Sequence, residues 1–378
     1  MVETLFWASL AFVVYVYAGY PLLLALWKRS SSRPVRKSPW EPSVSLVIAA
    51  HNERDTIEHK IRNCLELDYP RARLQIVIAL DAPTDGTEEV VWRHAGRVVD
   101  TVYYSPHRGK AGALNRAMEV AEGEIVVFAD ARQRLDTAAL RHLVANLHDP
   151  AVGAVSGELV LLDEHGREAG DGVGLYWRYE KWLRTCESEV HSTLGATGAL
   201  YAIRRDLYRP APDDTVLDDV AIPMQIVLSG KRAVFEPAAR VYDVVASSPE
   251  AEYGRKVRTL MGNYQLLARM PALLAPWCNP VFAQFVSHKV ARLLVPWALA
   301  ALLISNLFLP RGIYLLALAG QIIFYGLAAA GCLLSKNGAA NRGAGCRVPR
   351  LAPHHHLAAA RAAAGEQAFA IEGHQEKR

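Results

Sequence analysis

LQIVIALD at 74–81 is an apolar run that ends on a carboxylate, and EIVVFAD at 124–130 and TVLDD at 215–219 repeat this form. A carboxylate at the carboxyl end of a buried strand lies where open α/β sheets bind their ligands. The three segments therefore predict one polar site in one domain. Its candidate residues are Asp81, Asp130, Asp218 and Asp219.

Around these segments, short apolar runs alternate with amphipathic ones. Strands are expected at 45–49, 74–80, 98–104 and 124–129, and helices at 54–67, 86–95 and 111–121. Such alternation indicates a parallel, doubly wound α/β sheet. Beyond residue 150 the pattern is mixed, with strands expected at 152–162 and 199–203 and helices at 173–190 and 220–228.

Apolar segments lie on both sides of this domain. Residues 5–27 carry no charge, and about 20 apolar residues are enough to cross a bilayer. The segments 290–309 and 312–334, separated by Pro310 and Arg311, predict a second and a third span arranged as a hairpin. Basic residues follow the first span and open the second, so the positive-inside rule places residues 28–289 in the cytoplasm of a multi-pass protein of the inner (plasma) membrane.

The chain is thus expected to consist of six parts. They are an N-terminal transmembrane anchor (1–27), a linker (28–42), a cytoplasmic catalytic domain (43–250), interfacial amphipathic helices (251–289), a transmembrane hairpin (290–334) and a disordered tail (335–378).

Charge and motifs exclude several classes of function. The net charge of the chain is only +4, and the basic residues cluster next to the predicted membrane spans. This pattern disfavours nucleic acid as a partner and favours anionic lipid headgroups. The chain has no GxxxxGK[ST] loop and no glycine fingerprint between a strand and a helix. A P-loop phosphotransferase and a Rossmann dehydrogenase are therefore disfavoured.

Six segments resemble, in order, the motifs of the family 2 glycosyltransferases, in particular the membrane-bound bacterial enzymes related to cellulose, chitin and hyaluronan synthases. They are SLVIAAHNE at 45–53, ALDAPTDGT at 79–87, GKAGALN at 109–115, FADAR at 128–132, TGALYAIRR at 197–205 and LDDV at 217–220. The resemblance implies a GT-A fold, a Rossmann-like nucleotide-diphospho-sugar transferase domain, here with one N-terminal and two C-terminal transmembrane helices. It also implies transfer of a sugar from a nucleotide donor.

The resemblance assigns the donor site residue by residue. Asp81 would hydrogen-bond the uracil of a UDP-sugar, with Ala50 and Glu53 lining the base and ribose. Lys110, at a helix start, would meet the diphosphate, and Asp130 would hold it through Mg²⁺ or Mn²⁺.

The acceptor site is assigned in the same way. Asp219 would be the general base of an inverting displacement, and Asp218 beside it keeps the pair acidic. Gly198, Arg255 and Arg258 fall on the acceptor or phosphate side. Taken singly, these residues also have structural explanations: Asp81 in a turn, Asp218 as a helix cap and Lys110 as a surface charge.

Two departures from the family pattern limit this assignment. Arg132 replaces the second acid of the DxD motif, which weakens a hard-cation site. Either Asp130 holds the ion with help from elsewhere, or Arg132 contacts phosphate directly. The segment RKVRT at 255–259 keeps only the arginine of the processive synthases' QxxRW motif, so transfer of one or few sugars is expected rather than a long polymer.

The predicted function is that of an inverting glycosyltransferase. It would move a sugar from a UDP-sugar to a lipid-linked or glycan acceptor in cell-envelope or exopolysaccharide synthesis. Two alternatives remain open: a polyprenyl-phosphate glycosyltransferase, whose phosphate acceptor needs no strong base, and an inactive nucleotide-binding membrane scaffold.

Overall fold

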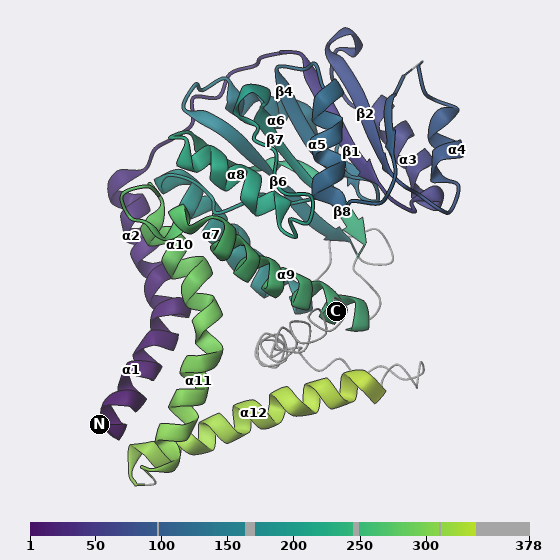
Figure 1. Cartoon of the computed structure of the whole chain (residues 1–378). Helices are drawn as coiled ribbons and strands as arrows, with labels where there is room; N and C mark the ends of the chain where they lie inside the picture. The colour runs from purple at the N-terminus through teal and green to yellow at the C-terminus, as the bar shows by residue number, and fades with distance from the viewer. Residues whose placement is uncertain (97, 163–170, 245–248, 310, 338–378) are drawn as a thin grey trace, which may run out of the picture.

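The structure is a computed structural model that describes residues 1–96, 98–162, 171–244, 249–309 and 311–337. Figure 1 shows an α/β domain from which the helices α1 and α11 extend together on one side. The predicted tail lies outside the described residues from 338 onward.

One sheet of eight strands, in the order β3-β2-β1-β4-β7-β6-β8-β5, forms the centre of this domain. The strands are β1 (Val44–Ala50), β2 (Leu74–Asp81), β3 (Asp100–Tyr104), β4 (Ile125–Asp130), β5 (Arg134–Leu135), β6 (Val152–Leu162), β7 (Leu200–Arg204) and β8 (Arg232–Val244). The first four in spatial order are parallel. β7 is antiparallel to both β4 and β6, whereas β6 and β8 are parallel to each other and β5 is antiparallel to β8.

The expectation of parallel strands is therefore confirmed for the four strands from which it was drawn, whereas β5 and β7, for which no direction was predicted, run antiparallel to their neighbours. An apolar run identifies a buried strand but carries no information on its direction, which the connections set. The prediction of the individual strands in the parallel half is confirmed to within two residues at each end.

Side chains that alternate along each strand are buried on both faces of the sheet, and helices pack against each face. In β1, Leu46 and Ile48 pack into a core with α3 (Arg54–Leu65), α4 (Thr87–Trp92) and α6 (Ala139–Leu147). Val47 points to the other core, formed with α5 (Lys110–Val120) and α8 (Asp218–Leu228). Because side chains alternate with period two, Asp81 and Asp130 leave the ends of β2 and β4 on the α5 face. The helix that begins at Lys110 is thus placed against both acids.

Four further helices connect this domain to the apolar part of the chain. They are α7 (Asp171–Val190), α9 (Pro249–Arg269), α10 (Phe282–Phe285) and the π-helical turn η5 (Val286–Val290), which runs directly into α11 (Ala291–Leu307). α7 corresponds to the helix expected at 173–190, and α9 overlaps the start of the segment 251–289, where amphipathic helices are expected.

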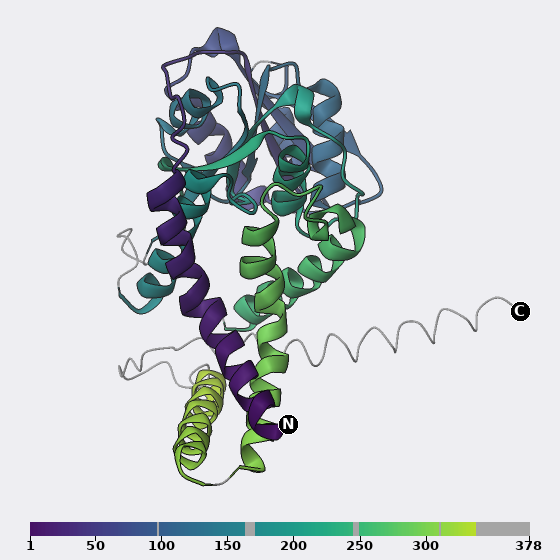
Figure 2. The ribbon, with the colours of Figure 1, turned by 90° about the vertical axis from the view of Figure 1, so that its left-hand side faces the viewer.

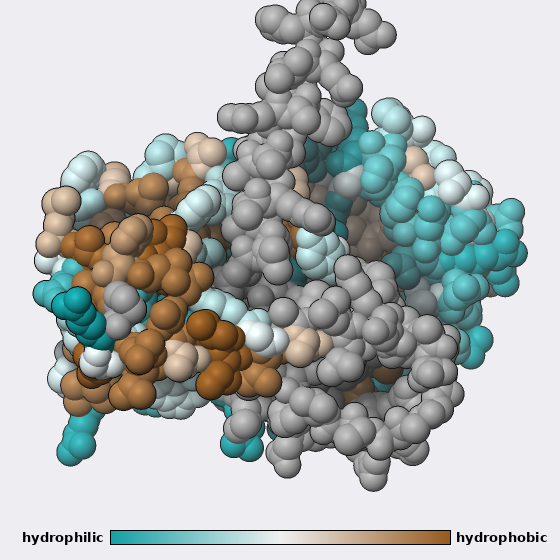
Figure 3. All heavy atoms as spheres, turned by 90° about the horizontal axis from the view of Figure 1, so that it is seen from below, coloured by the Kyte–Doolittle hydropathy of each residue, from teal (hydrophilic) through white to brown (hydrophobic). Residues whose placement is uncertain are grey.

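Two continuous helices are long and apolar enough to cross a membrane. One runs over Val2–Ser31 as α1 (Val2–Val14), the π-helical turn η1 (Tyr15–Gly19) and α2 (Tyr20–Ser31), and the other over Phe282–Leu307. They pack along each other through Val16 and Val295. Apolar side chains cover the outer surfaces of these helices (Figure 3), and Leu22, for example, is 63% exposed.

The third predicted span corresponds to α12 (Ile313–Asn337), which begins with the apolar stretch Ile313–Leu327. Figures 1 and 2 show α12 diverging from the lower end of α11, whereas α1 lies alongside α11. The described residues therefore contain two helices of spanning length, and the count of three stays a prediction.

Candidate active site

Asp81 ends β2, and both of its carboxylate oxygens accept hydrogen bonds from the backbone. Its Oδ1 accepts from the backbone N–H of Arg108 at 2.8 Å, and its Oδ2 accepts from that of Gly109 at 2.8 Å. Gly109 precedes α5 with φ +83°, a left-handed conformation that glycine adopts without steric cost. The carboxylate therefore fixes the turn that starts α5 while staying at the ligand-binding edge of the sheet.

Two histidines flank this carboxylate. His107 Nδ1 lies 2.8 Å from Asp81 Oδ2, and His51 Nδ1 lies 2.6 Å from the Asp81 carbonyl oxygen. The two imidazole rings are 4.2 Å apart between centroids. Among the described residues, this trio is a group whose ligand atoms lie close enough together to hold a metal ion. His107 could not be assigned to this site from the sequence, because it lies in a loop three residues after β3.

Lys110 joins a second group of acids on the same face of the sheet. Its Nζ donates to Asp130 Oδ1 at 2.6 Å and to the carbonyl oxygen of Gly198 at 3.1 Å, and it lies 3.7 Å from Asp218 Oδ2. Burial opposes the charge of Lys110, but the carboxylates of Asp218 and Asp130 outweigh it and hold the pKa of Lys110 above its ordinary value. The ammonium is therefore the fixed positive centre of the site.

The acid pair opens helix α8. Asp218 is buried, and its Oδ2 has no hydrogen-bond partner among the described residues. Asp219 lies against Gly198, where an added Cβ would come within 2.8 Å of Asp219 Oδ2. Burial raises the pKa of both carboxyl groups, and Lys110 acts against this rise in each. A buried carboxylate with few donors has a raised proton affinity, which is what a general base requires.

Arg132 forms an ion pair outside the cluster of Lys110 and its acids. Its Nη2 donates to Asp243 Oδ2 on β8 at 2.7 Å, and Gln133 Nε2 donates to the same oxygen at 3.0 Å. Asp243 thus binds the guanidinium that replaces the family's second acid. Direct contact of Arg132 with phosphate, one of the two alternatives from the sequence, requires this ion pair to open.

Asp130 fits a divalent cation as a single protein ligand. Its Oδ1 is bound to Lys110, and its side chain is 34% exposed toward the site. Mg²⁺ and Mn²⁺ bound with nucleotides take one or two carboxylates, with phosphate oxygens and water as the remaining ligands. Asp130 is consistent with that coordination, and the His51–Asp81–His107 trio lies at a different part of the sheet edge.

The other predicted residues take no part in these two clusters. Ala50 is buried in the core on the α3 face, so only its backbone faces the donor edge. Glu53 Oε2 accepts from Thr56 Oγ1 at 2.6 Å. Arg255 and Arg258 are exposed on α9, and within the described part of the chain no side-chain hydrogen bond or ion pair connects them to the acids.

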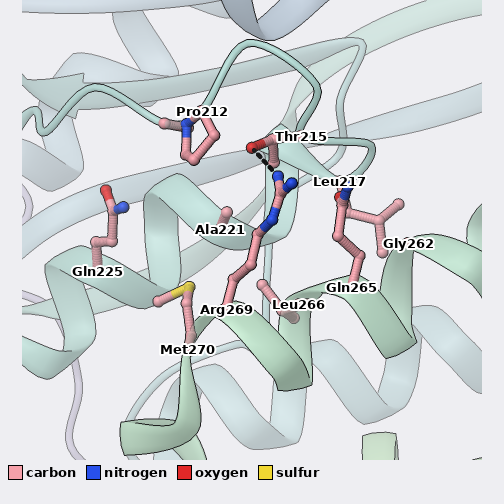
Figure 4. Close-up of a pocket in the computed structure, with 11 residues that line it drawn as sticks. Pro212, Thr215, Leu217, Ala221, Gln225, Gly262, Gln265, Leu266, Arg269 and Met270 are labelled. Carbon is pink, nitrogen blue, oxygen red and sulfur yellow. Dashed lines mark hydrogen bonds between the residues drawn. The ribbon is translucent and has the colours of Figure 1, made fainter. Parts of the chain in front are cut away.

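Helix α9 supports the loop that precedes the acid pair. Gln265 Oε1 accepts from the backbone N–H of Val216 at 2.9 Å, and Arg269 Nη2 binds Asp214 Oδ2 at 2.5 Å. At Gly262 a Cβ would lie 2.6 Å from Leu217 Cγ, so the helix and loop are in close contact. Figure 4 shows Arg269 reaching to Thr215 across a cavity of about 290 Å³ between α8 and α9. Asp218 and Asp219 therefore depend on α9 for their position.

Comparison with known protein families identifies the domain that carries most of these residues. The family model for glycosyl transferase family 2 matches residues 45–208, which include Asp81, Lys110, Asp130 and Gly198. The chain carries a family 2 glycosyltransferase domain. This confirms the family predicted from the sequence.

Relatives of this glycosyltransferase domain include two poly-beta-1,6-N-acetyl-D-glucosamine synthases. The synthase of Staphylococcus aureus (strain MSSA476) is 26% identical over 236 residues, which cover 60% of this chain and 56% of the relative. That of Staphylococcus epidermidis (strain RP62A) is 24% identical over 239 residues, with the same coverage. The match spans just over half the length of these curated relatives.

A solved structure resembles the chain over nearly its whole length. It is the mannosyltransferase PcManGT from Pyrobaculum calidifontis, in complex with GDP-Man and Mn²⁺, with 26% identity and a TM-score of 0.69. The likeness covers 97% of this chain and 99% of that one. The GT-A class of α/β fold is thereby confirmed, and the similarity extends to the apolar helices.

Proposed function

We propose that the protein is a membrane-anchored, inverting glycosyltransferase that transfers a sugar from a UDP-sugar to a lipid-linked or glycan acceptor. The observation that carries the proposal is the juxtaposition of a partly buried carboxylate, Asp219, with the Lys110–Asp130 pair across Gly198. A base with raised proton affinity thus lies beside a positive centre suited to a diphosphate leaving group.

The donor nucleotide would bind at Asp81. A carboxylate accepts hydrogen bonds only, so it selects a base that presents a ring N–H, which uracil and guanine do. Uracil is our first choice because the chain's motifs resemble those of the UDP-sugar enzymes. Transfer of mannose from GDP-mannose is the second candidate, favoured by the likeness over 97% of the chain to a mannosyltransferase that was solved with GDP-Man.

The reaction follows from the positions of the charged groups. The acceptor hydroxyl oxygen forms a bond to the anomeric carbon as its proton passes to Asp219, and the bond from that carbon to the β-phosphate oxygen breaks. The electron pair leaves on the nucleoside diphosphate, where Lys110 offsets the developing charge. A divalent cation at Asp130 would supply further charge neutralisation. Attack from the face opposite the leaving group inverts the anomeric centre.

The cellular setting is part of the proposal. The helices Val2–Ser31 and Phe282–Leu307 would cross the inner (plasma) membrane, with the catalytic domain in the cytoplasm, where nucleotide sugars are made. Helix α9 and the segment up to residue 289 would lie at the lipid surface. Because threonine rather than tryptophan directly follows Arg258, one or few sugars would be added to each acceptor.

The test uses the full-length protein in lipid nanodiscs. Incubation with a panel of UDP-sugars and GDP-mannose, with Mn²⁺ or chelator and a lipid-linked acceptor, should release nucleoside diphosphate and give product of inverted anomeric configuration by NMR. Retained configuration would contradict the mechanism. Binding of nucleotide without any turnover would support the inactive scaffold instead, and full activity of Asp219→Asn would support a phosphate as the nucleophile.

A further inference from the structure

Two cations that the proposed reaction does not use lie on the membrane side of Asp219. They are Arg184 on α7 and Lys289 in η5. What they bind bears on the acceptor, so this inference rests on the proposed function and makes its acceptor more specific.

Arg184 is connected to the catalytic base through two consecutive residues. Its Nη1 donates to Thr197 Oγ1 at 3.0 Å, and Thr197 is followed by Gly198, against which Asp219 lies. Within the described residues, this is the one hydrogen bond of the guanidinium. Since a guanidinium offers five N–H donors in a planar fork, several remain available to a ligand.

Lys289 is half-buried and has neither a hydrogen bond nor an ion pair among the described residues. Its charge nevertheless acts on Asp219: burial raises the pKa of that carboxyl group, and Lys110, Lys289 and Arg184 all act against the rise. A partly buried ammonium is costly unless an anion or several acceptors pair with it. A bound anion would provide that pairing.

The π-helical turn η5 brings Lys289 close to α7, the helix that carries Arg184, because the preceding residue His288 contacts Glu187 of α7. Ser287 Oγ lies 2.7 Å from Tyr15 Oη of η1, and His288 Nδ1 lies 2.6 Å from Glu187 Oε1 on α7. These contacts hold the two residues before Lys289 against different neighbours. π-helical turns inside α-helices occur frequently at functional sites, and here both apolar helices contain one at the same level.

Lys289 also stands two residues before α11, whose outer surface is apolar. Trp297 and Ile304 are 53% and 56% exposed along that helix. A lipid chain lying beside α11 would therefore bring its polar headgroup to the level of Lys289 and Arg184. Both side chains form strong, charge-assisted hydrogen bonds with phosphate oxygens.

We propose that Arg184 and Lys289 form an acceptor subsite for the phosphate of a membrane lipid that carries a sugar through a phosphate or diphosphate ester. The phosphate binds between the two cations, and a hydroxyl of the attached sugar reaches Asp219. The subsite restricts acceptors to lipid-linked sugars, in preference to neutral glycans.

Direct binding tests this subsite independently of turnover. Nanodisc-embedded protein loaded with UDP is titrated with two probes that share one sugar and one alkyl chain, joined by a diphosphate in the first and by a plain ether in the second. We expect the wild type to prefer the first probe by about tenfold or more. Arg184→Gln and Lys289→Gln should each lower this preference several-fold, and Lys289→Arg should restore most of it.

A matched control is Arg62→Gln, which removes the same charge from an exposed position on α3 and should leave the preference unchanged. UDP affinity, measured in parallel, should be equal in all variants and shows that each is folded. Equal affinity of the wild type for both probes, or a preference that survives the Arg184→Gln, Lys289→Gln double variant, would overturn the subsite. Failure of the proposed function itself would appear separately, as an absence of sugar transfer with the phosphate preference intact.

Discussion

Asp81 ends strand β2 and Asp219 lies in the first turn of helix α8, after a loop rather than the strand suggested by the apolar run at 215–217. The surroundings of the two carboxylates are opposite. Asp81 accepts hydrogen bonds on both oxygens from the backbone of residues 108–109. Asp219 is partly buried beside Asp218, its carboxylate accepts no hydrogen bond among the described residues, and burial raises its pKa. The difference indicates that a carboxylate saturated with donors serves as a fixed recognition group, whereas one without such donors is suited to take up a proton.

The largest effect expected is on turnover when the proton acceptor is removed. Asp219→Asn keeps the shape of the side chain but cannot accept the proton, so kcat should fall about 10³-fold. Initial rates of nucleoside diphosphate release with a saturating acceptor measure this. Asp206→Asn, at an exposed aspartate in the short helix Arg205–Leu207, is the control and should keep most of the activity.

Removing the positive centre between the two acids should have the next largest effect. Lys110→Met leaves Asp130 and Asp218 facing each other without a cation. We expect kcat to fall about 10²-fold, because the leaving diphosphate loses a preorganised charge. Thermal unfolding should also occur at a lower temperature, since the remaining acids repel each other. An unchanged kcat would show that Lys110 serves only the fold.

A smaller effect is expected from moving Asp219 without changing its chemistry. In Gly198→Ala the new Cβ would meet Asp219 Oδ2 at 2.8 Å and displace the carboxylate. A fall in kcat of about tenfold, with donor KM nearly constant, is expected from such misplacement. Gly254→Ala is the matched control because nothing lies within 4 Å of its added Cβ. Equal rates in the two variants would remove the geometric argument.

The pH dependence tests the electrostatic side of the comparison. A base works only when deprotonated, and burial raises the pKa of Asp219, so kcat/KM should fall with decreasing pH at a higher pH than for an ordinary aspartate. Lys110 opposes the rise in pKa. Its loss in Lys110→Met should therefore shift this acid limb to higher pH. A limb that stays in place would contradict the assignment of the titrating group to Asp219.

The two halves of the sheet also differ in how far sequence alone predicts them. β1, β2 and β4 are uninterrupted apolar runs, so their strands and terminal acids could be located. β8 (RAVFEPAARVYDV) mixes charges and a proline with its apolar residues, and it was not predicted. Helix α6 was missed as well, and the antiparallel direction of β7 depends on chain connections that no local pattern records.

In the candidate site too, contacts between residues far apart in the sequence could not be predicted from local patterns. Motif order placed Lys110, Asp130, Gly198 and the acid pair in one site, and the structure brings them into contact. The partner of Arg132 is Asp243, 111 residues further along the chain, and such a pair leaves no local signal. Arg184 and Lys289 were likewise unpredictable, because their orientation depends on α7 and on a π-helical turn.

The separation of roles between Asp81 and Asp219 is tested most directly by the UDP dissociation constants of Asp81→Asn and Asp219→Asn, measured side by side by calorimetry. Asp81→Asn replaces an acceptor with an amide and should weaken UDP binding about tenfold or more, as expected for the loss of a charged hydrogen bond. Asp219→Asn should bind UDP within about twofold of the wild type, a difference too small to reflect a lost hydrogen bond. Equal weakening in both variants, or weakening in Asp219→Asn alone, would contradict the account.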